Sequence, residues 1–120
     1  MSKPSPSVPP VLSHFPTEVQ SAYLRFVEDG KEADLRILIH AALRDFMPRK
    51  VDRPAPAVFE PGQALIGDLG LDSLAVAEMV FFFEDLFQIT IPSQEILNLS
   101  TVADLEGYVG RKLRETVKAA

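Results

Sequence analysis

The sequence of 120 residues contains no cysteine and only two histidines, His14 and His40. Without cysteine, disulfide bonds, zinc–thiolate sites and a protein thiol nucleophile are excluded. No apolar run approaches the ~18 residues needed to span a bilayer. Lys3 is followed by Pro4 and Ser5, which is not the charged-then-apolar pattern of a secretory signal. We therefore expect a cytoplasmic protein without a transmembrane segment.

Basic residues are also missing from one long part of the chain. Between Glu60 and Gly110 there is no lysine, arginine or histidine, and the whole chain has a net charge of −5. This charge argues against nucleic acid as a partner and suits a partner with a basic surface. The alternative is an ordinary solvated acidic surface. The acidic residues in this part are Glu60, Asp68, Asp72, Glu78, Glu84, Asp85, Glu95, Asp104 and Glu106.

The hydrophobic pattern predicts an all-helical bundle with a single core. Helices are expected at 16–28, 32–47, 73–87 and from Thr101 onward, with one or two helical turns at 93–98. The last helix has Val102, Leu105, Tyr108, Val109 and Leu113 as its apolar stripe, and Thr101 with Asp104 has the spacing of a helix start. No strand pairing or internal repeat is evident.

The N-terminal residues divide into two segments. Residues 1–15 are rich in proline and serine, which predicts a disordered tail, and residues 16–30 predict a separate helix that ends at Gly30. Thr17 and Gln20 have the spacing of a capping box at its start. The sequence does not decide whether this helix packs on the core, and residues 31–118 form the remaining domain.

A long connection, 48–70, joins the helix at 32–47 to the helix at 73–87. Loops of this length inside a compact domain are unusual and often functional. Its apolar residues are expected to hold it against the core, and Ala64 to Gly67 to form a helical turn. The apolar residues are Val58, Phe59, Leu65, Ile66 and Leu69.

The helix at 73–87 has two different faces at 100° per residue. Its core face is expected to contain Val76, Met79, Val80, Phe83, Leu86 and Phe87. Leu74 and Phe81 fall instead on the opposite face, among Glu78 and Asp85, with Glu84 at the margin. Large apolar residues surrounded by carboxylates predict a docking surface, although isolated exposed hydrophobic residues are also ordinary.

Ser73 lies at the start of this helix, after Gly70, Leu71 and Asp72. A helix N-terminus favours an attached anion such as a phosphate, because its backbone N–H groups and dipole face that end. The alternative is that Asp72 or Ser73 is only an N-cap. Hydrolase chemistry is disfavoured, because no histidine follows the serine and Leu71 interrupts a glycine–aspartate–serine–leucine signature. No metal-ligand cluster is evident either.

Three segments together resemble the acyl carrier protein family. They are Asp68-Leu69-Gly70-Leu71-Asp72-Ser73-Leu74, then Phe83-Glu84-Asp85-Leu86-Phe87 with Ile89-Thr90-Ile91-Pro92, and finally Thr101-Val102-Ala103-Asp104-Leu105. The resemblance covers about residues 34–113. It implies a four-helix bundle with a long first loop, in which Ser73 receives a 4′-phosphopantetheine arm from coenzyme A. The chain would be a carrier and not an enzyme.

The resemblance also implies roles for the neighbours of Ser73. Asp72 would assist a phosphopantetheinyl transferase and its magnesium ion, and no metal would be resident in the carrier itself. The surface that docks on basic patches of acyl-loading, elongating and acyl-transfer enzymes would consist of Leu74, Glu78, Phe81, Glu84 and Asp85. The chain departs from the family pattern at Ala75, where an acidic residue is usual, and at Phe81-Phe82-Phe83, which is bulkier than the common aliphatic run.

We therefore expect a free-standing, monomeric acyl carrier protein that presents thioester-bound acyl groups to enzymes of lipid or polyketide-type biosynthesis. A peptidyl or aminoacyl carrier of the same fold is one alternative, although its serine motif more often has a glycine pair before the serine. A helical interaction domain with an unmodified Ser73 is the other.

Overall fold

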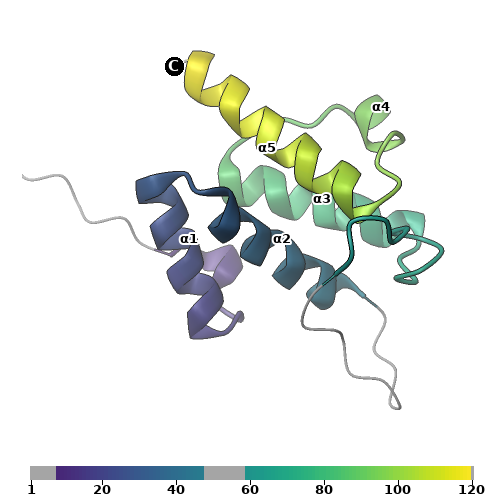
Figure 1. Cartoon of the computed structure of the whole chain (residues 1–120), viewed down its shortest axis with the longest axis horizontal. Helices are drawn as coiled ribbons and strands as arrows, with labels where there is room; N and C mark the ends of the chain where they lie inside the picture. The colour runs from purple at the N-terminus through teal and green to yellow at the C-terminus, as the bar shows by residue number, and fades with distance from the viewer. Residues whose placement is uncertain (1–7, 48–58, 120) are drawn as a thin grey trace, which may run out of the picture.

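The computed structural model of the chain describes residues 8–47 and 59–119, and these form a helical bundle (Figure 1). The described ranges contain no strand, and one isolated antiparallel bridge joins Ala64 to Thr101. The all-helical prediction is confirmed. The elements are η1 (Pro10–Leu12), α1 (Thr17–Asp29), α2 (Glu32–Phe46), α3 (Ser73–Phe87), α4 (Ser93–Ile96) and α5 (Val102–Ala119).

The core lies between α2, α3 and α5. The predicted core face of α3 is confirmed, with Phe87 half-buried and the other five residues buried. The stripe predicted for α5 is buried as well, except for half-buried Leu113. Helix α5 begins with the expected cap, because the Asp104 amide donates to Thr101 Oγ1 at 3.1 Å and the Thr101 amide donates to Asp104 Oδ2 at 3.1 Å. In both helices the apolar residues that recur at helical spacing are therefore the ones that the structure buries.

The prediction of a disordered tail is wrong for residues 8–15, and residues 1–7 lie outside the described part. Residues 10–12 form a 3₁₀ turn, in which Leu12 is 1% exposed. Phe15 is also buried, and its ring lies 5.6 Å from the ring of Phe82 on α3. Burial of these two side chains stabilises an ordered segment that its proline content alone does not predict.

The capping box predicted at Thr17 and Gln20 is also wrong. Pro16 occupies the N-cap position without a side-chain hydrogen bond. The Gln20 side chain instead turns toward the preceding segment, where Nε2 donates to the backbone oxygens of Leu12 at 3.2 Å and Phe15 at 3.0 Å. Gln20 thus ties helix α1 to the 3₁₀ turn.

Helix α1 packs on the bundle as an additional helix. Val19 and Ala22 are buried, α1 lies against α2, and the ring of Phe26 meets the edge of Phe87 at 5.9 Å. Gly30 ends the helix as predicted, with φ of 69°, which suits a residue without a side chain. The segment before α2 is therefore part of the folded domain.

The described part of the long loop lies against the core. Phe59, Leu65 and Leu69 are buried as predicted, whereas Ile66 is 59% exposed and the prediction for it is wrong. The helical turn is present, because the amides of Asp68 and Leu69 both donate to the Ala64 oxygen. Val58 lies outside the described residues. Among the helices that are described, none has the length and hydropathy needed to cross a membrane.

Candidate functional site

Ser73 is the first residue of α3, and it is exposed. Asp72 caps the helix: its Oδ1 accepts a hydrogen bond from the Ala75 amide at 2.7 Å, and its backbone oxygen accepts one from the Val76 amide at 3.0 Å. Because the first backbone N–H groups of a helix have no intrahelical acceptor, those of Ser73 and Leu74 suit an anion held on the serine oxygen. Asp72 is therefore the N-cap of α3, and the exposed Ser73 that follows it provides the hydroxyl.

A short, closed turn positions this hydroxyl. Leu69 and Leu71 are 4% and 1% exposed, so the chain is held in the core on both sides of Gly70. The Leu71 amide donates to the Leu65 oxygen at 3.1 Å, and the Gly70 amide donates to the Ile66 oxygen at 3.1 Å. Gly70 has φ of 77°, a left-handed conformation that favours glycine. Ser73 is thus exposed on a fixed backbone.

Four of the five residues predicted for docking lie on the outer side of α3. Leu74 is 66% exposed, Phe81 is 62% exposed, and Glu78 and Asp85 are exposed too. A carboxylate-rimmed apolar surface therefore begins directly beside Ser73 and follows the helix.

Glu84 differs from these four residues. It is half-buried, and its Oε2 accepts a hydrogen bond from the Ile91 amide at 2.8 Å. This contact ties the end of α3 to the connection that leads into α4. Sequence reasoning missed it, because helical spacing does not show which backbone amide a side chain beyond the helix will reach.

The two histidines make contacts that do not involve Ser73. His14 pairs with Asp45 at 3.3 Å, whereas His40 is buried, with Nε2 2.8 Å from Glu106 Oε2. In the part of the chain that the structure describes, no three His, Asp or Glu side chains gather as metal ligands would. The arrangement at Ser73 thus has a hydroxyl and a cap, with both histidines engaged elsewhere.

Tyr108 fixes α4 to α5. Its hydroxyl donates to Glu95 Oε1 at 2.9 Å, and Lys112 Nζ lies 3.5 Å from the same carboxylate oxygen. Burial and the hydrogen bond to Glu95 raise the pKa of Tyr108 to about 12. The phenol therefore stays protonated at neutral pH and serves as a donor in the structure.

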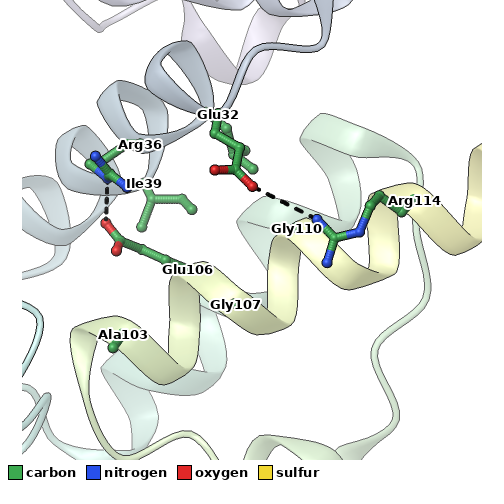
Figure 2. Close-up of a pocket in the computed structure, with 9 residues that line it drawn as sticks. Glu32, Arg36, Ile39, Ala103, Glu106, Gly107, Gly110 and Arg114 are labelled. Atoms are coloured by element: carbon green, nitrogen blue, oxygen red, sulfur yellow. Dashed lines mark ion pairs between the residues drawn. The ribbon is translucent and has the colours of Figure 1, made fainter.

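A groove of about 240 Å³ lies between α2 and α5 (Figure 2). Two ion pairs join the helices along it: Arg36 with Glu106 at 3.5 Å, and Glu32 with Arg114 at 4.0 Å. All residues that line the groove come from α2 and α5, so Ser73 is not among them. The candidate site is consequently a surface hydroxyl and not this groove.

Residues 41–109 match the family model described as the phosphopantetheine attachment site. This is more than half of the chain. The protein belongs to the acyl carrier protein family. The match begins inside α2, so η1 and α1 lie outside the matched residues.

Curated relatives agree with this assignment. An acyl carrier protein of Exiguobacterium sp. (strain ATCC BAA-1283 / AT1b) is 50% identical over 46 residues, which cover 38% of this chain and 58% of the relative. The meromycolate extension acyl carrier protein of Mycobacterium tuberculosis (strain ATCC 25618 / H37Rv) is 31% identical over 65 residues, or 54% of this chain and 56% of the relative. The chain thus spans somewhat more than half the length of these relatives.

The family match identifies residues 41–109 as a carrier domain for covalently attached 4′-phosphopantetheine. The chain fits this group, because it offers an exposed hydroxyl at a helix N-terminus, where a phosphate is favourably placed. The group supplies a terminal thiol, which forms thioesters and which a chain without cysteine cannot provide itself.

Proposed function

We propose that Ser73 is the attachment site and that the loaded protein presents acyl groups to separate enzymes of lipid or polyketide-type biosynthesis. The observation that carries this proposal is the exposed Ser73 at the start of α3, capped by Asp72 and inside the matched residues 41–109. The names of the relatives, which include a meromycolate extension carrier, support acyl cargo.

The attachment step requires coenzyme A and a phosphopantetheinyl transferase. Ser73 Oγ attacks the phosphorus that bears the pantetheine, and an O–P bond forms as the diphosphate P–O bond breaks. Adenosine 3′,5′-bisphosphate leaves, and the serine proton passes to a base of the transferase. Asp72 is exposed and directly precedes Ser73, so we propose that its carboxylate assists the transferase-bound magnesium ion.

The docking surface in this proposal consists of Leu74, Glu78, Phe81 and Asp85. Its carboxylates attract basic patches of partner enzymes, and its two apolar side chains make the central contact. Such docking is fast, weak and sensitive to salt, which suits a carrier that visits several enzymes. Glu84 adds charge at the margin while its hydrogen bond to Ile91 holds the loop.

Intact-mass measurement after incubation with coenzyme A and an active transferase tests the attachment site. The wild-type protein should gain the mass of one phosphopantetheine, and Ser73→Ala should gain none. Ser93→Ala is the matched control, because Ser93 is also an exposed serine at the start of a helix but follows Pro92 instead of an aspartate. Modification of Ser73→Ala would show that another residue is used.

The same measurement separates the alternative functions. A wild-type protein that gains no mass, with a transferase that modifies a reference carrier, would favour the unmodified interaction domain. The mass of the protein purified from its own host identifies the cargo on the arm. An acyl group on the arm supports our proposal, whereas an amino acid or peptide would favour the peptidyl carrier.

A further inference from the structure

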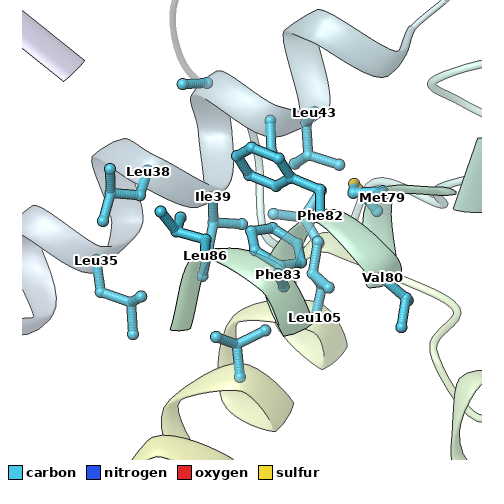
Figure 3. Packing of buried hydrophobic residues seen from close by; sticks show 14 of the residues in the cluster. Leu35, Leu38, Ile39, Leu43, Met79, Val80, Phe82, Phe83, Leu86 and Leu105 are labelled. Atoms are coloured by element: carbon cyan, nitrogen blue, oxygen red, sulfur yellow. The ribbon is translucent and has the colours of Figure 1, made fainter. Parts of the chain in front are cut away.

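Two phenylalanine rings fill the interior between α2, α3 and α5 (Figure 3). Phe83 is fully buried, Phe82 is 8% exposed, and their ring centroids are 5.4 Å apart. Figure 3 shows both rings among Ile39 and Leu43 of α2, with Leu105 of α5 nearby. Phe87 stacks on Phe83 at 6.2 Å and continues the aromatic packing along α3. Close-packed interiors resist insertion of additional methylene groups.

The N-terminal segment holds Phe82 in this position. Its ring is contacted by Phe15 at 5.6 Å and by Phe46 of α2 at 6.0 Å. Leu12 of η1, three residues before Phe15, is also buried, and η1 lies against α3. Phe15 lies outside the family match and Phe46 inside it, so part of the cover on Phe82 comes from the segment that precedes the matched residues.

Hydrogen bonds hold the connection from α3 to α4 and α4 itself. Glu84 Oε2 accepts from the Ile91 amide, and Ile89 and Ile91 are both buried. On the other side of α4, Tyr108 donates to Glu95 at 2.9 Å. Separating these elements to admit an apolar chain would break the Glu84–Ile91 and Tyr108–Glu95 hydrogen bonds.

An apolar hollow of about 380 Å³ does exist on the surface, but at the far end of α3. It is lined by Phe26, Leu35 and Leu113, among others. Phe26 contacts Phe87, the last residue of α3, whereas Ser73 is the first. At 1.5 Å per residue these ends are on the order of 20 Å apart.

We propose that Phe82 and Phe83 fill the space that an acyl chain would need and thereby keep the cargo outside the bundle. On this view, which rests on the proposed attachment at Ser73, the carrier exposes its acyl chain to solvent and to the partner enzyme instead of enclosing it. The segment that precedes the matched residues has a defined part in this arrangement, because Phe15 covers the ring of Phe82.

The test uses the full chain loaded with octanoyl-phosphopantetheine from octanoyl-coenzyme A, with loading confirmed by intact mass. Backbone amide chemical shifts are then compared with those of the unacylated holo protein. We expect changes near Ser73 only, and hydroxylamine should cleave the protein thioester as fast as octanoyl-pantetheine. Changes at Met79, Leu105 and Val109, or at the hollow around Leu113, with slower cleavage, would overturn the proposal.

Two variants test whether the rings of Phe82 and Phe83 keep the octanoyl chain outside the bundle. Phe83→Leu leaves space in the interior, and a protein cavity lined by apolar side chains binds small apolar ligands. In this variant, or in Phe82→Leu if Phe83→Leu does not fold, we expect interior shift changes and several-fold slower thioester cleavage. Phe26→Leu is the matched control and should behave as wild type. A folded Phe83→Leu or Phe82→Leu protein with the wild-type pattern would contradict the role given to the rings.

A failure of the proposed function is distinguishable from a failure of this inference. If Ser73 is not the attachment site, the mass and the Ser73→Ala control show it before any shift is measured. Only a protein that is loaded at Ser73 and also encloses its octanoyl chain would contradict the inference while leaving the proposed function intact.

Discussion

Phe81 and Phe83 lie two residues apart on α3 and have opposite environments. Phe81 is 62% exposed on the same face as Glu78 and Asp85. Phe83 is fully buried between α2 and α5. The two faces of one helix therefore give the same residue type different effects. On the inner face a phenyl ring stabilises the bundle and fills its interior, and on the outer face it is available to a partner.

The difference shows how little of the functional surface is needed for folding. Leu74, Glu78, Phe81 and Asp85 are exposed and outside the buried core, so we expect that partner choice can change without loss of the fold. Asp72 differs from them, because its carboxylate caps α3 and the residue directly precedes the proposed attachment site in the chain.

The largest expected effect is on the inner face. Phe83→Ala should lower the free energy of unfolding by about 3–5 kcal/mol, because it removes a fully buried ring and leaves a cavity. Phe81→Ala, the matched change on the outer face, should alter it by less than about 0.5 kcal/mol. Urea unfolding followed by circular dichroism measures both. Equal losses in the two variants would contradict the assignment of the faces.

The next effect concerns charge on the outer face. Glu78→Lys with Asp85→Lys should slow modification by the transferase about tenfold at low salt, because electrostatic steering toward a basic partner is lost. The variant should remain folded, since both side chains are exposed. Modification rates measured across a salt series should converge as screening increases. A rate equal to that of the wild type at low salt would remove these carboxylates from the docking surface.

A smaller effect is expected at Asp72, the N-cap residue of α3. Asp72→Ala should lower the free energy of unfolding by about 1 kcal/mol, because the Ala75 amide loses its acceptor. Asp72→Asn keeps an acceptor oxygen and should restore most of that stability. Because both variants lack the carboxylate, the transferase should modify both more slowly than the wild type. If Asp72→Asn were modified at the wild-type rate, the carboxylate would have only its capping role.

Much of this fold follows from local sequence signals. The limits of α3 are the predicted residues 73–87, because Asp72 provides the cap and the apolar residues recur at helical spacing over four turns. The start of α5 follows from Thr101 and Asp104 in the same way. Ser73 could be selected because these signals place it at a helix start, on a turn that contains Gly70.

The remaining features depend on contacts between distant residues. Order at residues 8–15 comes from burial of Leu12 and Phe15 on α3, which proline content does not reveal. Gln20 reaches back to η1 instead of capping α1, because acceptors from the 3₁₀ turn lie within its reach. Ile66 is exposed although apolar, because the turn around it buries its neighbour Leu65 instead.

The central claim is that the prosthetic group is attached to Ser73. Residues 60–110 contain no lysine or arginine, so trypsin would leave Ser73, Ser93 and Ser100 in one peptide. A protease that cleaves after acidic residues separates Ser73 from the other two serines at Glu78, Glu84 and Asp85. Tandem mass spectrometry of holo protein cut in this way should find phosphopantetheine on the Ser73 peptide. Its presence on a peptide with Ser93 or Ser100, or its absence from all three serines, would contradict the account.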